Sequence, residues 1–160
     1  MAAPEFEIFW GDLTDSDMLA LGLFLAVAAA PYVVAWRQET SIALATVLSL
    51  LLVTFYQMII DFGLFDFTPM AFLTLIPSIA DHPDQVHRFF TSAWLHANWI
   101  HVLGNILVIA LAGVPLEQRM GRSRWIVIYF VGLLGGNISW VLTHPDSNIP
   151  ALGASGAAFG

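Results

Sequence analysis

Four long apolar runs with almost no charge inside them constrain this chain more than any other feature. They cover residues 18–36, 42–60, 99–115 and 125–142. A helix that spans a bilayer needs about 20 apolar residues, and each run is close to that length. Only 11% of the 160 residues are charged, and the runs lack the polar stripe of a soluble amphipathic helix. The sequence therefore predicts an all-α fold, a polytopic transmembrane helix bundle.

The segments between these runs differ in composition. Residues 1–17 are acidic and are expected to form an extracytoplasmic leader before the first span at 18–36. The short turn at 37–41, with Ser41 as a helix N-cap, predicts an antiparallel hairpin with the run at 42–60. Residues 62–93 contain three prolines, which rule out one continuous helix and favour short pieces at the membrane interface. A further helix is expected to begin at about 152 and to run to 160.

The positions of the arginines predict the orientation of the bundle. Arg37 follows the first run, and Arg119, Arg122 and Arg124 lie between the third and the fourth. If the four runs alternate in direction, these arginines share one side of the membrane, and basic residues favour the cytoplasmic side. The sequence thus predicts a multi-pass protein of the cell (plasma or inner) membrane with an extracytoplasmic N-terminus. Arg88 is on the opposite side, which predicts a specific local partner for it.

Composition and spacing exclude several other classes of function. The formal net charge is −7 and lysine is absent, so no basic patch is large enough for nucleic acid. The absence of cysteine excludes disulfides, thiolate metal sites and a thiol nucleophile. His82, His87 and His144 do not match the spacing of a metal site, and no metal or other cofactor is expected. A transporter or channel would require charges within the spans, whereas the cores of the third and fourth runs have none.

Polar residues in two apolar segments indicate a candidate site. His101 and Asn105 are four residues apart, so they share one face of a helix, where such groups need partners or water. The candidate partner is Ser155 in Gly153-Ala-Ser155-Gly156, at the start of the last helix. A serine nucleophile needs a base and positioned donors for its oxyanion. The side chains of His101 and Asn105 and the Ser155 N–H are candidate donors, and the two glycines leave space for a neighbouring helix. A Gly-Ala-Ser-Gly segment alone is more often a packing motif, so the hypothesis depends on the combination.

Four motifs, in this order and spacing, resemble the rhomboid intramembrane serine proteases over roughly residues 87–160. They are Arg88-Phe-Phe-Thr-Ser-Ala-Trp-Leu-His96, His101-Val-Leu-Gly-Asn105, Glu117-Gln-Arg119-Met-Gly121 and Gly153-Ala-Ser155-Gly156. The resemblance implies that residues 41–160 form part of a six-helix core, with 42–60 as its first helix and 62–93 as a membrane-embedded loop. The span at 18–36 would then be an extra N-terminal helix.

The resemblance also implies roles for individual residues. Ser155 would be the nucleophile, with His101 and Asn105 as donors to the oxyanion, and the substrates would be membrane-anchored proteins cut in or near their transmembrane segment. His96 would be structural. The sequence itself favours a structural role for Glu117 and Arg119, as a polar pair at the cytoplasmic end that bonds to backbone groups, and for Gly121 as a helix stop.

Two departures from the family pattern affect what the chain is expected to do. The family often has Trp immediately before the loop arginine, where this chain has His87. The family's general base is a histidine on the sixth core helix, whereas residues 152–160 correspond to the start of the fourth. The chain is therefore expected to be the front portion of a protease, truncated within core helix 4 and inactive alone. The alternative is a non-catalytic relative that binds transmembrane clients, although Ser155 in its glycine-rich setting favours the protease. No oligomeric state is predicted.

Overall fold

The computed structural model describes residues 10–60, 69–147 and 149–159. Within these residues it contains helices and one isolated β-bridge, between Leu75 and Ala151. Four helices are long and apolar enough to cross a membrane: α1 (Asp15–Arg37), α2 (Ile42–Ile59), the continuous run Trp99–Met120 and α7 (Arg122–Thr143). The predicted all-α polytopic bundle is thus confirmed. The parts of the predicted leader at residues 1–9 and of the first loop at 61–68 lie outside the described residues.

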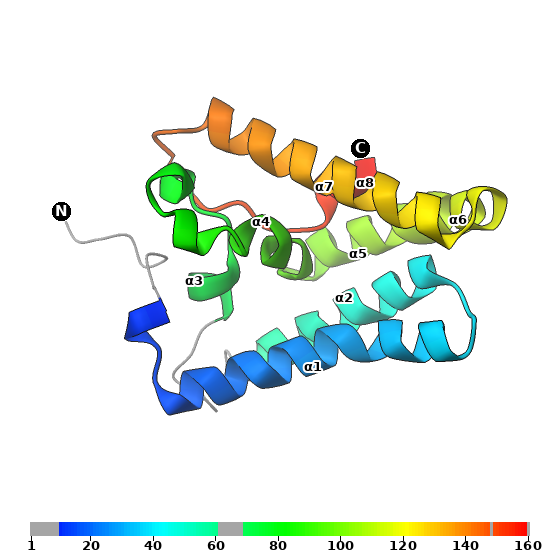
Figure 1. Cartoon of the computed structure of the whole chain (residues 1–160), viewed down its shortest axis with the longest axis horizontal. Coiled ribbons are helices and arrows are strands. Elements are labelled where there is room, and N and C mark those ends of the chain that lie inside the picture. Colours follow the sequence, from blue (N-terminus) through cyan, green and yellow to red (C-terminus); the bar gives the residue numbers. More distant parts are fainter. Residues whose placement is uncertain (1–9, 61–68, 148, 160) are drawn as a thin grey trace.

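Helices α1 and α2 pack side by side as an antiparallel hairpin (Figure 1). α1 begins at Asp15, three residues earlier than predicted, because Thr14 and Asp17 form a capping box. The Asp17 N–H donates to Thr14 Oγ1 at 3.3 Å, and the Thr14 N–H donates to Asp17 Oδ2 at 2.7 Å. α2 begins after the predicted N-cap, Ser41, whose Oγ accepts a hydrogen bond from the Leu44 N–H at 3.1 Å.

The third span changes its helical pitch in the middle. α5 (Trp99–Val108) passes into a π-helical segment, η6 (Ile109–Gly113), and then into α6 (Val114–Met120). Pro115 has no N–H to donate to the preceding turn, and the wider π turn directly before it accommodates that missing bond. α6 ends at Gly121, whose φ of +83° lies in the region that favours glycine. Gly121 is therefore the helix stop that the sequence predicted.

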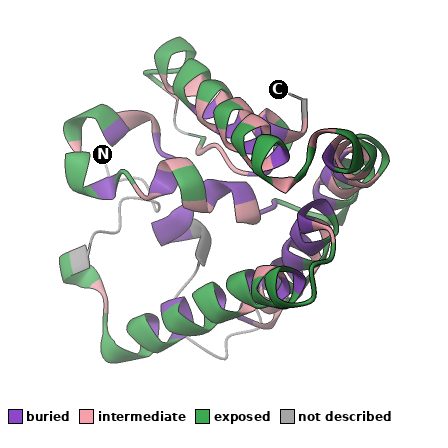
Figure 2. Ribbon diagram, turned by 45° about the vertical axis from the view of Figure 1, so that its right-hand side comes forward, coloured by how far each residue is buried: buried purple, intermediate pink, exposed green. Residues whose placement is uncertain are grey.

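Five short helices replace the continuous helix that the prolines exclude. They are α3 (Pro69–Leu73), η3 (Pro77–Asp81), η4 (Pro83–Gln85), α4 (Arg88–Thr91) and η5 (Ser92–Trp94), and three of them begin with proline. α4 packs on α7 and η5 packs on α2. Figure 2 shows buried segments along these short helices, in the middle of the molecule. This part of the chain is therefore built into the bundle and supports the segment around Ser155.

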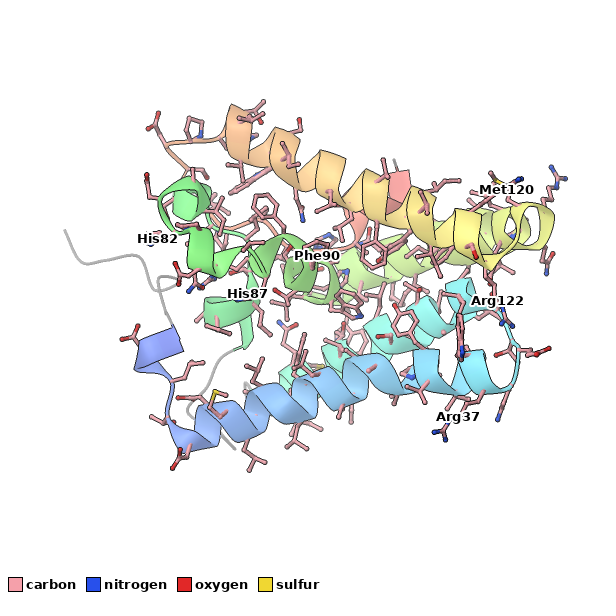
Figure 3. All side chains as sticks on the ribbon, in the orientation of Figure 1. Arg37, His82, His87, Phe90, Met120 and Arg122 are labelled. Atoms are coloured by element: carbon pink, nitrogen blue, oxygen red, sulfur yellow. The ribbon has the colours of Figure 1, made fainter. Side chains whose placement is uncertain are left out.

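The two ends of the bundle carry different side chains. Arg37, at the end of α1, and Arg122, at the start of α7, lie at one end (Figure 3). His82 and His87 lie at the other end, among the short helices. The fold thus gathers arginines on one side of the bundle, as the alternation of the spans predicted.

Candidate active site

Ser155 begins the short helix α8 (Ser155–Phe159) and faces an open cavity. The cavity has a volume of about 680 Å³, and Ser155 is exposed. Its described lining residues are Ala97, His101, Gly136, Asn137, Trp140, Ile149, Pro150, Ala151, Leu152, Gly153, Ser155 and Gly156. His101 is the one titratable side chain among these described residues. The fold thus brings Ser155 and His101 to the same cavity from segments that are distant in the sequence.

Gly153 lies close to two side chains of α5, His101 and Asn105. Its φ is +107°, a backbone conformation that favours glycine. A Cβ atom at this position would lie 2.7 Å from both Cε1 and Nε2 of His101 and 3.5 Å from Asn105 Nδ2. The Gly153 N–H donates to the Ser92 carbonyl at 2.8 Å. Both the conformation and the space at this position therefore require glycine.

His101 and Asn105 lie on one face of α5 but at different depths. His101 is half-buried and lines the cavity, whereas Asn105 is 2% exposed and lies beneath Gly153, outside the set of lining residues. Asn98 fixes the start of α5, because its Oδ1 accepts a hydrogen bond from the His101 N–H at 2.9 Å. Within the described part of the chain, no hydrogen bond joins the Ser155 side chain to His101 or Asn105.

His96 holds the amide group of Asn105 in place. Asn105 Nδ2 lies 2.9 Å from His96 Nε2, and His96 Nδ1 lies 3.2 Å from the Trp94 carbonyl. A neutral His96 with its proton on Nδ1 satisfies both contacts, accepting from Asn105 and donating to Trp94. Burial first, and then the neighbouring His101 ring at 5.0 Å between centroids, lower the pKa of His96 to about 4. His96 is therefore neutral near pH 7, which is the state that this tautomer requires.

Gly156 allows α8 to lie close to α7. A Cβ atom at Gly156 would be 3.4 Å from the Gly132 carbonyl oxygen and from the Gly136 Cα, and one at Gly136 would be 2.9 Å from the Gly156 Cα. The neighbouring Gly135 is exposed, and a Cβ atom added there would meet nothing within 4 Å. The small residues of α7 that hold α8 are thus Gly132 and Gly136.

Arg88 is fully buried and makes the local contacts that its position predicted. Its Nη1 donates to the carbonyls of Ala71 and Thr74 at 3.1 and 2.9 Å, and its Nε donates to Gln85 Oε1 at 3.0 Å. The guanidinium also lies 5.6 Å from the centroid of the Phe72 ring. Arg88 therefore ties α3, η4 and α4 together.

His87, which stands where the family often has tryptophan, also contacts Phe72. The two rings stack with centroids 4.8 Å apart, and His87 Nε2 lies 3.3 Å from the Phe72 carbonyl. Burial lowers the pKa of His87, which favours the neutral ring. His87 thus supplies a flat ring and a polar atom at the position of the usual indole.

Glu117 is bonded to the start of α2. Its carboxylate accepts hydrogen bonds from the Ser41 hydroxyl at 2.5 Å and from the N–H groups of Ile42 and Ala43, both at 2.8 Å. The basic side chain nearest to it is Arg122, at 4.0 Å, whereas Arg119 is exposed. Glu117 is thus bonded to backbone groups, as predicted, and these groups belong to the start of α2.

Two buried amide side chains near the site were missed in the sequence analysis. Gln57 on α2 makes two hydrogen bonds to the His96 backbone. Its Nε2 donates to the His96 carbonyl at 3.2 Å, and its Oε1 accepts from the His96 N–H at 3.5 Å. Asn137 on α7 lines the cavity and donates to the Phe89 carbonyl at 2.7 Å. An amide inside an apolar span is the signal that could have found both, since such groups are costly without partners.

No group of three or more His, Cys, Asp or Glu residues in the described ranges is placed to hold a metal ion. The cavity is lined by the hydroxyl of Ser155 and the imidazole of His101, and the Asn105 amide lies behind Gly153. A hydroxyl, an imidazole and an amide are groups used in acyl transfer.

Comparison with known proteins identifies the part of the chain that holds this site. Residues 83–160 match the family model described as the Rhomboid domain. RHOMBOID-like protein 2 of Arabidopsis thaliana is 42% identical over 79 residues, which cover 49% of this chain and 24% of that protein. Rhomboid-related protein 3 of Homo sapiens is 32% identical over 85 residues, covering 51% of this chain and 20% of that protein.

A relative of a different kind is also similar. Inactive RHOMBOID-like protein 8 of Arabidopsis thaliana is 37% identical over 75 residues, covering 47% of this chain and 20% of that protein. The chain spans between a fifth and about a quarter of the length of the curated relatives that it matches. No solved structure matches it.

Proposed function

Because this chain is a member of the rhomboid family through residues 83–160, we propose that it acts as an intramembrane serine endopeptidase. Ser155 is the nucleophile in this proposal. The observation that carries it is the meeting of Ser155 and His101 at one cavity, with Gly153 seated against the His101 ring. Packing alone would require neither an exposed serine nor a polar ring at this place.

The proposed reaction follows from the groups at the cavity. Ser155 Oγ attacks the carbonyl carbon of the scissile peptide bond while a base takes its proton, and the carbonyl oxygen becomes an oxyanion. A ring N–H of His101, an amide N–H of Asn105 and the backbone N–H of Ser155 are the proposed donors to that oxyanion. His96 accepts one hydrogen of the Asn105 amide, and the second hydrogen of Nδ2 is the one proposed to bind the oxyanion.

The proton acceptor lies outside the described residues that line the cavity. His101 is their one titratable side chain, and the proposal assigns it to the oxyanion. A base must be within hydrogen-bond reach of the serine hydroxyl, and the resemblance to the family implies a histidine on a later helix. When the oxyanion reforms the carbonyl, the C–N bond breaks, the base returns its proton to the leaving amine, and the first product departs from an acyl-enzyme on Ser155. Water then hydrolyses this ester, which releases the carboxylate product and restores the Ser155 hydroxyl.

Membrane-anchored proteins are the proposed substrates, cut in or near their transmembrane segment. The four long apolar helices support a location in a lipid bilayer. The cell (plasma or inner) membrane is the proposed location. The clustering of Arg37 and Arg122 at one end of the bundle supports a cytoplasmic position for that end. The short helices and the N-terminus are then extracytoplasmic.

A non-catalytic function is the second candidate, favoured by the similarity to a relative named inactive. In that case, the same cavity would bind a transmembrane client without cutting it. The two proposals differ in the role of one atom, Ser155 Oγ. Replacement of Ser155 by alanine abolishes proteolysis in the first case and leaves client binding intact in the second.

The test is cleavage of a transmembrane reporter by the full-length protein in proteoliposomes. We expect the wild type to release a fragment cut in or near the membrane segment and Ser155→Ala to release none. Ser139→Ala is a matched control, because Ser139 is an exposed serine of α7. Equal cleavage by wild type and Ser155→Ala would exclude Ser155 as the nucleophile. Binding of the reporter without cleavage by either protein would favour the non-catalytic alternative.

A further inference from the structure

Helix α7 holds the serine motif on both sides of Ser155 through two adjacent residues. Gly136 packs against Gly156, the residue after the serine, at a distance that leaves no room for a side chain. Asn137, the next residue of α7, is linked to Gly153, two residues before the serine, through the loop segment that contains Ser92. The first contact is packing, whereas the second is a series of hydrogen bonds.

The amide of Asn137 binds two points of that loop segment. Its Nδ2 donates to the Phe89 carbonyl at 2.7 Å and to Ser92 Oγ at 3.3 Å. Asn137 is 8% exposed and Ser92 is 1% exposed, so the contacts are shielded from water. An amide and a hydroxyl in such surroundings are costly unless they are bonded. These bonds therefore fix α4 and η5 against α7.

The same loop segment is also hydrogen-bonded to the serine motif, so its position affects that of the motif. The Ser92 carbonyl accepts the hydrogen bond of the Gly153 N–H at 2.8 Å. Gly153 is the residue whose Cα hydrogen faces the His101 ring and the Asn105 amide. A shift of Ser92 would therefore move Gly153 relative to the two side chains that the proposed function assigns to the oxyanion.

We propose that Asn137 is a positioning residue for Ser155, acting through Ser92 and the Gly153 N–H. The proposal rests on the proposed function, in that the residue it positions is the assigned nucleophile. Asn137 does not touch the reacting atoms in this proposal. It keeps the distance between Ser155 and the oxyanion donors constant, and misplacement of reacting groups by about 1 Å can lower the rate 100-fold.

Two substitutions remove different members of the series of hydrogen bonds that links Asn137 to Gly153 through Ser92. Asn137→Leu has a similar size but lacks both N–H donors, and Ser92→Ala removes only the hydroxyl and keeps the carbonyl that accepts from Gly153. We expect Asn137→Leu to lower kcat by about tenfold or more with a smaller change in KM, because the loss affects alignment more than binding. Ser92→Ala should act in the same direction and less strongly. The double variant should be no slower than Asn137→Leu, since both remove the same link.

Amide hydrogen exchange separates positioning from general stability and does not depend on catalysis. In the full-length protein, we expect Asn137→Leu and Ser92→Ala to speed exchange at Gly153 by about tenfold while the amides of α1 and α2 are unchanged. Ser139→Ala, on the exposed side of α7, should leave exchange and kcat unchanged. A folded Asn137→Leu or Ser92→Ala protein with unaltered exchange at Gly153 would overturn the proposal, as would faster exchange spread over all helices.

The same measurements distinguish failure of this proposal from failure of the proposed function. Suppose that the wild type cuts no transmembrane reporter while Asn137→Leu and Ser92→Ala still speed amide exchange at Gly153. The link through Asn137 then stands and the protease function fails. If the wild type cuts the reporter and neither variant alters kcat, the protease function stands and the link is overturned.

Discussion

Substitution of Gly153 by alanine is expected to damage the site more than any other change of one methyl group. The φ of +107° strains any residue with a Cβ, and such strain costs about 1–3 kcal/mol. The added Cβ would also lie 2.7 Å from two atoms of the His101 ring. The ring must withdraw by about 0.7 Å to reach 3.4 Å, where ordinary contact begins. A displacement of that size at a reacting group lowers rates by about 10- to 100-fold.

The assay combines thermal unfolding with the rate at which a fluorophosphonate probe labels Ser155. We expect Gly153→Ala to lower both the midpoint of unfolding and the labelling rate in the full-length protein. Gly104→Ala is the matched control, because Gly104 lies on the same helix as His101 and has nothing within 4 Å of an added Cβ. If Gly153→Ala unfolds and reacts like Gly104→Ala, the close approach of Gly153 to the His101 ring is wrong.

Three further substitutions or conditions test other contacts. Gly136→Ala should separate α8 from α7 and slow labelling of the serine, whereas Gly135→Ala, which meets nothing within 4 Å, should not; equal effects would contradict the assigned contact. The pKa of His96 is lowered from 6.5 to about 4, so the unfolded chain binds a proton more readily between these values. The contribution of His96 to the free energy of unfolding should therefore be full above pH 6.5 and should fall by up to about 3 kcal/mol toward pH 4. A His96→Gln variant whose thermal unfolding depends on pH as that of the wild type does would refute this. Glu117→Gln should lower the free energy of unfolding by about 2 kcal/mol, because its carboxylate binds three donors of α2, whereas substitution of the exposed Arg119 should change it by less than about 0.5 kcal/mol.

The sequence was sufficient for the spans and for the residues that end them. Apolar length, the N-cap at Ser41 and the stop at Gly121 depend on local properties, and the structure has the helices where these predict them. The sequence predicted that Glu117 bonds to backbone groups but not that these groups belong to α2, because the direction of a side chain across the bundle depends on how α2 and α6 pack. A nearby arginine in the sequence does not reveal that direction.

The candidate site was only partly predictable for a related reason. The four-residue spacing of His101 and Asn105 predicted their common face, but not that Asn105 lies beneath Gly153 while His101 lines the cavity. The contributions of Gln57 and Asn137 depend on backbone groups that are 39 and 48 residues away. A single polar residue in an apolar span indicates that a partner exists, and only the packed helices identify the partner.

Identification of the residue that carries the covalent adduct of a fluorophosphonate probe tests the central claim most directly. The full-length protein is labelled in membranes, digested and mapped by mass spectrometry, with Ser155→Ala and Ser139→Ala treated alongside. The proposed function predicts one adduct, on Ser155, that is lost in Ser155→Ala and retained in Ser139→Ala. An adduct on another residue, or no adduct in a protein that cuts a transmembrane reporter, would contradict the assignment of Ser155 as the nucleophile.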